Sequence, residues 1–330
     1  MKKRILVIIL SFFLIGLSGC QSDRQESWEK QVFWGFDTWI EVTVPSSYSR
    51  LLPKVKTYVQ QLDQEWNRFS SSSLISKIND SPSPCRVDKD TFHLIELSWK
   101  LKEKTGGFFH IGVASLVDLW GFSTRPRVPS PAEIEKALAE LAEFSIVIDY
   151  QKQTVTVENG KIDLGGIAKG YLVDYIANFL RKEGVTKGLI NAGGTVTGWG
   201  KKWKVGVTHP RQPELLGYIM VDGQVVSTSG DYFRYLEKEG KRYSHILNPF
   251  TGYPKDDFLS ATVVAENGAL ADALSTAIMA GGWEALSSIR AEFPQVGIVL
   301  VEQEGIVYLS PSVQPYFTLS LPELELRDLL

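Results

Sequence analysis

The sequence predicts an α+β fold, in which mixed or antiparallel sheets flanked by helices form one domain. Strand-like alternation of apolar and polar residues occurs in several short segments, most clearly at residues 39–44. Amphipathic helical patterns lie between these segments, as at residues 48–67. Neither an internal repeat nor a change in composition divides the chain, so a single domain over residues 28–330 is expected.

The composition is that of an ordinary globular protein. The chain has 330 residues, of which 44% are hydrophobic and 22% charged, and this length can bury a substantial core. The formal net charge is -3. Nucleic-acid binding usually requires a basic patch or stripe, so no nucleic-acid partner is expected.

The N-terminus has the pattern of a targeting segment. Basic residues at positions 2–4 precede an apolar run at 5–17, which is too short to span a bilayer as a stop-transfer helix. The following Leu17-Ser18-Gly19-Cys20 resembles a bacterial lipoprotein signal. Residues 1–19 are therefore expected to be a lipoprotein signal peptide and 20–27 a flexible tether. The alternative is an ordinary secretory signal with an incidental cysteine.

Acylation of the Cys20 thiol, as by palmitate, would anchor the domain to a membrane. The protein is accordingly expected to be lipid-anchored to a bacterial membrane, facing the periplasm or the cell exterior.

Strands and amphipathic helices are both expected in the first half of the domain. They are a strand at 33–44, helices at 48–67, 91–104 and 130–144, and a hairpin at 145–149 and 154–158. The helix at 130–144 begins with a capping box, Ser130-Pro131-Ala132-Glu133. The serine run at 70–73 is either a linker or a structured loop. The apolar, glycine-punctuated segment 108–122 contains two isolated polar residues, His110 and Asp118.

The stretch from Lys161 to Gly184 is expected to organise the molecule. A short extended strand ends at Asp163, Gly165-Gly166 form a turn, and helical spacing of apolar residues begins at Ile167. Glycines at such a turn allow a ligand to approach the backbone. The free amides of the helix start favour an anion such as phosphate. The alternative is a tight turn that only packs the helix onto a sheet.

The second half is expected to be richer in strands. They are strands at 188–191, 203–207, 242–247, 260–265, 296–301 and 306–309, a hairpin at 218–221 and 224–227, and a helix at 269–280. Asp222-Gly223, at the centre of the expected hairpin, is typical of a type I′ turn. His245 falls near the end of its strand, before a turn-rich loop at 248–254.

The helix at 269–280 carries a candidate metal site. Asp272 and Thr276 are spaced i, i+4 and lie on one helical face. A carboxylate and a hydroxyl that converge there suit a hard cation such as Mg²⁺. The alternative is an acidic residue near a helix start, where the helix dipole favours it.

Several glycine-rich turns stand beside isolated polar groups. They are Asp163-Leu-Gly-Gly with Lys169, Asn191-Ala-Gly-Gly, Thr228-Ser-Gly-Asp, His245, and Asp272 with Thr276. A metal ion, a lysine and backbone amides are what a pyrophosphate needs, because phosphoryl transfer depends on positioning and charge neutralisation.

The order of these motifs resembles the ApbE-type FAD:protein FMN transferase family, in its lipoprotein form. The resemblance covers nearly the whole chain after the expected signal peptide. The matching segments are residues 63–79, Thr105-Gly-Gly-Phe-Phe, Leu119-Trp-Gly-Phe, residues 163–174, Asn191-Ala-Gly-Gly, Thr228-Ser-Gly-Asp-Tyr, residues 244–254 and residues 271–277.

The resemblance implies an enzyme that binds FAD as substrate together with Mg²⁺. It implies transfer of the FMN moiety to a threonine or serine hydroxyl of an acceptor protein through a phosphoester bond, with release of AMP. The expected acceptor is a protein of a membrane electron-transfer complex.

The same resemblance assigns site residues. The metal ligands it implies are the carbonyl of Gly166 and the side chains of Asp272 and Thr276. The FAD-contacting positions it implies are Phe36, Phe69, Phe108, Phe109, His110, Asp163, Lys169, Ile246 and Leu247.

The chain also departs from the pattern of the family. His110 stands where the family usually has an aspartate, and Leu74 and Asn248 replace two further acids. The usual Met-Gly-Thr is Phe36-Asp37-Thr38 here. Our hypothesis from the sequence is that His110 and His245 are the catalytic residues. In it, His110 replaces the carboxylate as proton acceptor and His245 mainly orders the flavin.

Two other functions remain open at this point. The chain could be a lipid-anchored flavin-binding accessory protein without transferase activity, or an FAD pyrophosphatase that releases FMN and AMP.

Overall fold

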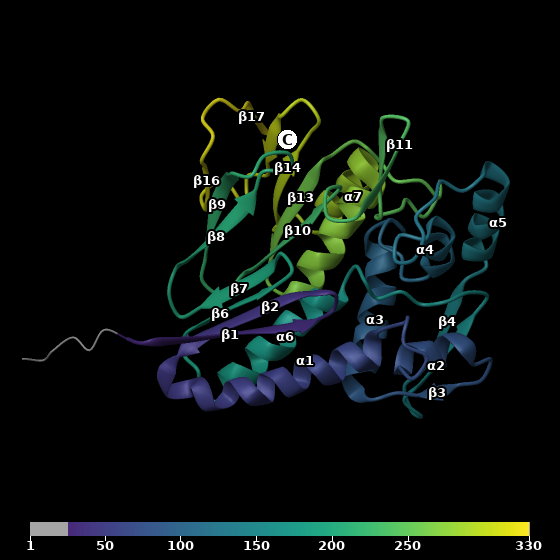
Figure 1. Cartoon of the computed structure of the whole chain (residues 1–330), viewed down its shortest axis with the longest axis horizontal. Helices are drawn as coiled ribbons and strands as arrows, with labels where there is room; N and C mark the ends of the chain where they lie inside the picture. The colour runs from purple at the N-terminus through teal and green to yellow at the C-terminus, as the bar shows by residue number, and fades with distance from the viewer. Residues whose placement is uncertain (1–25, 330) are drawn as a thin grey trace, which may run out of the picture.

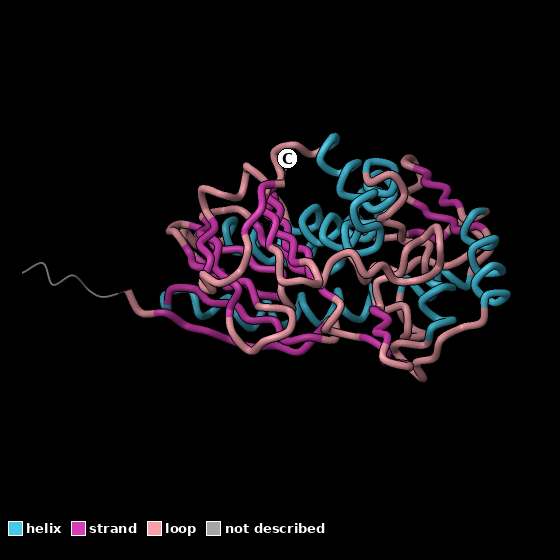
Figure 2. The backbone as a smooth tube through the Cα atoms, turned by 90° about the horizontal axis from the view of Figure 1, so that it is seen from above, coloured by secondary structure: helices cyan, strands magenta, loops and turns pink. Residues whose placement is uncertain are grey.

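The computed structural model describes residues 26–329. Within this range the chain forms an α+β domain, as the sequence predicts, with a large sheet between a layer of helices and a small sheet (Figure 1). Figure 2 shows most of the strands on one side of the molecule and most of the helices on the other. The expected signal peptide at 1–19 and the lipidation site Cys20 lie outside the described residues.

The large sheet has nine strands within the described range. In spatial order they are β1 (Trp28–Gly35), β2 (Thr38–Pro45), β6 (Gly188–Ala192), β7 (Thr195–Trp199), β10 (Val225–Gly230), β13 (Ser260–Ala265), β14 (Gly297–Val301), β15 (Val307–Leu309) and β17 (Leu326–Asp328). Neighbours pair antiparallel except β15 and β17, which are parallel. The sheet is therefore mixed, as expected.

Three smaller sheets complete the strand inventory of the described chain. They are β8 (Trp203–Thr208) with β9 (Leu215–Val221) and β16 (Phe317–Leu319), β3 (Cys85–Arg86) with β5 (Thr154–Glu158) and β4 (Ser145–Asp149), and the pair β11 (Tyr235–Lys238) and β12 (Lys241–Ser244). The sheet of β8, β9 and β16 covers one face of the large sheet. Val207 and Ile219 of that small sheet share a buried apolar cluster with Val299 of the large sheet.

Helices cover the opposite face of the large sheet and form a second lobe. They are η1 (Ser46–Leu51), α1 (Leu52–Trp66), α2 (Leu74–Asp80), α3 (Lys89–Lys104), α4 (Ala114–Trp120), α5 (Pro131–Ala142), α6 (Ala168–Lys182) and α7 (Gly268–Glu292). The helices α6 and α7 pack on the large sheet, whereas α2 to α5 lie in the lobe beside it (Figure 1). The expected capping box at the start of α5 is present, with Ser130 and Glu133 bonded reciprocally.

The crossing of α6 and α7 places the site residues. The two backbones meet at Gly170 and Gly268, where a Cβ on Gly170 would lie 2.0 Å from the Gly268 carbonyl oxygen. Asp174 of α6 accepts hydrogen bonds from the amides of Gly268 (2.7 Å) and Ala269 (3.0 Å) and so caps α7. Burial raises the pKa of Asp174 to about 6, although the two hydrogen bonds act to lower it. The crossing brings Asp272 beside the first turn of α6.

The prediction of a hairpin at 218–221 and 224–227 is wrong. β9 pairs with β8 and β16, whereas β10 pairs with β7 and β13, so the two segments belong to different sheets. The Asp222 carboxylate accepts a bond from Gly200 N (2.8 Å). The amide of Gly223 donates to the carbonyl of Gly198 (2.7 Å). These bonds hold the turn against the chain before β8. The hairpin does not form because the apolar faces of β9 and β10 are buried against each other in the layer between the two sheets.

The strand expected before Asp163 is also absent, since residues 161–164 join no sheet. The side-chain amide of Asn79 takes the place of a neighbouring strand there. It accepts from Ile162 N (2.7 Å) and donates to the Ile162 carbonyl (3.0 Å), while Asp163 N donates to the carbonyl of Ile111. One side chain thus takes both backbone hydrogen bonds of Ile162, which a neighbouring strand would otherwise provide.

Several other elements differ from expectation. The serine run leads into α2, whose N-cap is Ser73, so it is a structured loop rather than a linker. The apolar segment after His110 contains α4, and the strand after Gly193-Gly194 is β7; neither was predicted. The strand expected at 242–247 ends at Ser244, so His245 lies just beyond the strand.

Helix α7 is longer than expected. Helical dihedrals are interrupted at Gly282 (φ 60°, ψ -140°), where the sequence predicts the helix end, and the helix then resumes to Glu292. The resumed part is capped by Asp257, whose carboxylate accepts from Trp283 N (3.0 Å). No helix within residues 26–329 is both long enough and apolar enough to cross a bilayer.

Candidate active site

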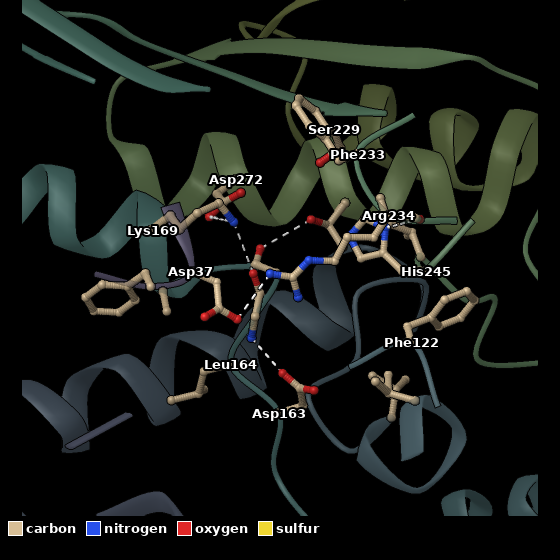
Figure 3. A pocket seen from close by; sticks show the side chains of 18 of the residues that line it. Asp37, Phe122, Asp163, Leu164, Lys169, Ser229, Phe233, Arg234, His245 and Asp272 are labelled. Carbon is tan, nitrogen blue, oxygen red and sulfur yellow. Dashed lines mark hydrogen bonds and ion pairs between the residues drawn. The ribbon is translucent and has the colours of Figure 1, made fainter. Parts of the chain in front are cut away.

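One cavity of about 450 Å³ lies where the helical lobe meets the large sheet (Figure 3). Its walls come from the β1–β2 turn, the segment after α1, the segment before α4, the start of α6, the chain after β10 and α7. All of the site residues expected within the described range line it. They are Phe36, Phe69, Phe108, Phe109, His110, Asp163, Gly166, Lys169, His245, Ile246, Leu247, Asp272 and Thr276. The volume is in the range of small-molecule sites.

Oxygen atoms converge at the inner end of the cavity. The Thr276 hydroxyl lies 3.4 Å from the carbonyl oxygen of Gly166, which is 110 residues away in sequence. Asp272 is 3% exposed and accepts from Gly170 N (3.0 Å) and Ser227 Oγ (3.4 Å). A Cβ on Gly166 would lie 2.9 Å from Thr276 Cγ2, so glycine permits this approach.

This donor set fits Mg²⁺ better than a softer metal. It consists of a carboxylate, a carbonyl and a hydroxyl, which are ligands of hard cations. Among the described residues, no group of three or more His, Cys, Asp or Glu side chains could hold an ion. Mg²⁺ is commonly bound by one or two carboxylates together with water and substrate phosphates. The site therefore suits a cation that arrives with, or is completed by, a phosphorylated ligand.

Lys169 lies beside this oxygen cluster. Its Nζ is 3.6 Å from Asp272 Oδ2 and 3.2 Å from the carbonyl oxygen of Gly165. Lys169 sits in the first turn of α6, and its hydrogen bond to Gly165 keeps the ammonium beside the Gly165-Gly166 turn. Figure 3 shows Lys169 next to Asp272. A phosphate there would meet both a cation and the start of a helix.

Asp163 is held by a buried arginine. Arg68 donates from Nε to Asp163 Oδ2 (2.7 Å) and from Nη2 to Asp118 Oδ1 (2.8 Å), and the Arg68 side chain is 6% exposed. The other oxygen of Asp163 accepts from Gly165 N (2.8 Å). Asp118 thus helps to hold Arg68, which in turn holds Asp163. Asp163 fixes the Gly165-Gly166 turn.

Aromatic side chains form the outer wall. Phe69 is 54% exposed and stacks against the guanidinium of Arg68, with 4.2 Å from Cζ to the ring centre. Phe108 packs edge-on against Phe250, whereas Phe109 lines the cavity with a side chain that is buried. Exposed rings at a cavity mouth provide a stacking surface for a flat ligand.

The two histidines have different hydrogen bonds. Nδ1 of His110 accepts from Gly112 N (3.0 Å), so the neutral ring carries its proton on Nε2. His110 also packs against Trp99 and Phe144, and desolvation together with the charge of Lys102 lowers its pKa to about 4. The lone pair on Nδ1 of His110 is therefore already used by Gly112, and the ring is not placed to act as a base.

His245 has the opposite tautomer. Its Nδ1 lies 3.0 Å from the carbonyl oxygen of Arg234, which can only accept, so the proton resides on Nδ1 and Nε2 keeps a lone pair. Desolvation, helped by the charges of Arg234 and Lys169, lowers the pKa of His245 to about 4, and the ring is neutral at pH 7. The hydrogen bonds thus favour His245 as proton acceptor, the reverse of the assignment expected from the sequence.

Other residues of the cavity were not predicted from the sequence. They include Asp37, Asp63, Arg68, Thr228, Ser229, Phe233 and Arg234. The sequence indicates a turn at Thr228-Ser-Gly-Asp, but Thr228, Ser229 and Gly230 form the end of β10. Arg234 lies three residues beyond Asp231. No local pattern marks Arg68 or Arg234 as cavity residues, because each is brought there by the packing of distant segments.

The fold and the cavity together define a class: an α+β protein with a cavity lined by aromatic rings, a lysine and an oxygen cluster that suits a hard cation. Known proteins agree with this class and narrow it. A sequence model described as the ApbE family matches residues 36–300. Since this match covers most of the chain, the protein belongs to the ApbE family.

Individual relatives are similar over most of their length. The FAD:protein FMN transferase of Klebsiella pneumoniae (strain 342) is 33% identical over 271 residues, covering 80% of this chain and 84% of the relative. The FAD:protein FMN transferase of Escherichia coli (strain K12) is 30% identical over 287 residues, covering 81% of this chain and 82% of the relative. The crystal structure of the ApbE protein from Thermotoga maritima superposes with a TM-score of 0.81 at 32% identity, covering 88% of this chain and 99% of the other.

Proposed function

We propose that this protein is an FAD:protein FMN transferase. It transfers the FMN moiety of FAD to a threonine or serine hydroxyl of an acceptor protein and releases AMP. Family membership and the names of its relatives support this activity. The observation that carries the proposal is the convergence of three things in one cavity: the Asp272 oxygen cluster, Lys169 and the unprotonated Nε2 of His245.

The inner end of the cavity binds the pyrophosphate of FAD. The Gly166 carbonyl, the Asp272 carboxylate and the Thr276 hydroxyl would hold Mg²⁺, which when bound neutralises charge on the pyrophosphate oxygens. Lys169 adds a second positive charge at the same point. The exposed aromatic wall, including Phe69, faces the flavin ring.

His245 accepts the proton of the acceptor hydroxyl. As Nε2 takes this proton, the hydroxyl oxygen forms a bond to the phosphorus of the FMN half. The bond from that phosphorus to the bridging oxygen breaks, and AMP leaves with the electron pair. The hydrogen bond from Nδ1 to the Arg234 carbonyl holds the ring and stabilises the imidazolium that forms. The product is a phosphoester between FMN and the acceptor.

A transfer assay tests this function. The protein is incubated with FAD, Mg²⁺ and a flavin-acceptor domain, and covalent flavin on the acceptor and free AMP are measured together. We expect covalent flavin and AMP in equal amounts. Bound FAD with no transfer would instead indicate a flavin-binding accessory protein. AMP released without acceptor would indicate an FAD pyrophosphatase.

We also propose that the protein works as a lipid-anchored enzyme on a bacterial membrane, facing the periplasm or the cell exterior. The Leu17-Ser18-Gly19-Cys20 segment supports this location. An anchored transferase would meet acceptor proteins of a membrane electron-transfer complex on the same surface.

A further inference from the structure

A salt bridge crosses the cavity between two residues that line it. Asp37 lies at the β1–β2 turn and Arg234 lies between β10 and β11, 197 residues later. Nη2 of Arg234 is 3.1 Å from Asp37 Oδ2, and the two side chains are 45% and 66% exposed. Figure 3 shows the guanidinium reaching into the cavity toward Asp37. The pair therefore joins two walls of the site that have no sequence proximity.

The cations that line the cavity differ in how firmly they are held. Arg68 is buried and its Nε and Nη2 are bound to two carboxylates, so its guanidinium is held in place. Lys169 is already engaged beside Asp272. Arg234 has an exposed side chain, which within residues 26–329 forms a salt bridge with one exposed carboxylate. Exposed ion pairs of this kind are weak and exchange readily.

The backbone of Arg234 is held by two hydrogen bonds, whereas its side chain is held by one exposed salt bridge. The carbonyl oxygen of Arg234 accepts from both the amide and Nδ1 of His245, each at 3.0 Å. The side chain of Arg234 therefore extends from a backbone position next to the proposed base, His245. A bidentate arginine contact to a phosphate is stronger than a single bond to an exposed carboxylate.

We propose that Arg234 binds a phosphate of the dinucleotide substrate and that Asp37 holds the guanidinium in the ligand-free protein. Substrate phosphate and Asp37 then compete for one arginine. Asp37 lowers the affinity for the nucleotide, and Arg234 raises it. The inference rests on the proposed function, because it concerns the phosphates of FAD in the same cavity.

Equilibrium binding of FAD and of ADP, both with Mg²⁺ and without acceptor, tests this competition. Arg234→Ala should weaken FAD binding by about tenfold or more, since a bond to a charged group is lost. Asp37→Asn should tighten FAD binding by about two- to fivefold, the strength of an exposed ion pair. ADP, which has the pyrophosphate and lacks the flavin, should show the same factors. A loss confined to FAD would overturn the phosphate contact.

The double variant decides whether Asp37 acts through Arg234. In the Arg234→Ala background, Asp37→Asn should have no effect on the dissociation constant of FAD. An undiminished gain there would overturn the competition. The matched control is the exposed pair of Glu325 and Arg327, with side chains 59% and 46% exposed and outside the cavity lining. Glu325→Gln and Arg327→Ala should leave FAD binding unchanged.

Acceptor recognition is the competing role for Arg234. If Arg234→Ala raised only the KM for the acceptor and left FAD and ADP binding intact, the inference would be wrong. Failure of the proposed function is distinguishable from this outcome, because it would appear as absent transfer by the wild type. Wild-type protein that bound neither FAD nor ADP would contradict both.

Discussion

At the residue scale, Asp272 has two functions that one substitution can separate. Its carboxylate belongs to the proposed Mg²⁺ site, and the same carboxylate accepts the buried amide of Gly170 at 3.0 Å. Removal of the whole side chain would leave that amide without its partner, which costs about 1–3 kcal/mol. Asparagine keeps an oxygen acceptor and removes the charge.

We therefore expect Asp272→Asn to lose transfer activity by on the order of 100-fold or more while it keeps the melting temperature of the wild type. Transfer rate against Mg²⁺ concentration and thermal unfolding measure the two effects. Asp272→Ala should lose both activity and stability. Full activity of Asp272→Asn at low Mg²⁺ would exclude Asp272 as a metal ligand.

The two histidines give the second prediction at this scale. Because Nε2 of His245 is the unprotonated nitrogen, His245→Ala should lower the transfer rate by about 100-fold or more with FAD affinity little changed. The Nδ1 lone pair of His110 already accepts the amide of Gly112 and the ring lines the cavity, so His110→Ala should mainly weaken FAD binding. Rates and FAD dissociation constants of both variants decide between the assignments. The reverse outcome would restore His110 as the proton acceptor.

The low pKa values of these histidines predict a pH dependence of stability. The folded pKa of each is about 4, below the usual 6.5, so the unfolded chain binds more protons between these values. Their contribution is complete above pH 6.5 and is lost as the pH falls toward 4. Asp174, whose pKa is raised to about 6, opposes this trend over part of the range.

The slope of the unfolding free energy against pH measures the effect. Replacement of the ring in His110→Phe should flatten the slope between about pH 4 and 6.5, because one of the two groups no longer titrates. Phenylalanine suits the position, since His110 packs between Trp99 and Phe144. An unchanged slope would show that His110 titrates alike in both states.

At the element scale, the crossing of α6 and α7 determines where the metal ligands lie. Gly170 and Gly268 let the helices touch, and Asp174 caps α7 from α6. The Gly166 carbonyl precedes one helix, and Asp272 and Thr276 belong to the other. A change in the crossing would therefore change the spacing of these ligands.

We expect Asp174→Ala to lower the free energy of unfolding by about 2–4 kcal/mol, because two partly buried amides lose their acceptor. It should also weaken Mg²⁺ binding, although Asp174 touches neither proposed ligand side chain. Chemical denaturation and metal titration measure these effects. Asp149→Ala is the matched control. Its carboxylate likewise accepts two amides, those of Gln151 and Lys152, but in an exposed turn.

The control should lose less than about 1 kcal/mol, because water replaces the carboxylate at exposed amides. If both variants lost the same free energy of unfolding, the cap of α7 by Asp174 would stabilise the domain no more than an exposed turn does.

At the scale of the whole molecule, the remaining prediction concerns location. Cys20→Ser should release the protein from membranes and block signal cleavage, because the thiol is the proposed acylation site. Cell fractionation and the mass of the N-terminus measure both effects. Membrane association of a Cys20→Ser protein with a processed N-terminus would contradict the lipoprotein proposal.

The sequence by itself determined the elements that depend on near neighbours. The start of α5 follows from Ser130 and Glu133, which bond to each other three residues apart. The α+β class, most helices and the hairpin of β4 and β5 follow from patterns of the same kind. Motif order was also sufficient to indicate the family that the comparisons establish.

The tertiary structure alone decided which segments meet. The hairpin at 218–227 was a reasonable local prediction, but the strands β9 and β10 gain more by burial in different sheets. The tautomers of His110 and His245 depend on Gly112 and Arg234, and the Asp37–Arg234 pair joins residues 197 apart. Local patterns reflect the free energy of a few neighbouring residues, whereas pairing and protonation depend on contacts that exist only after the chain has packed.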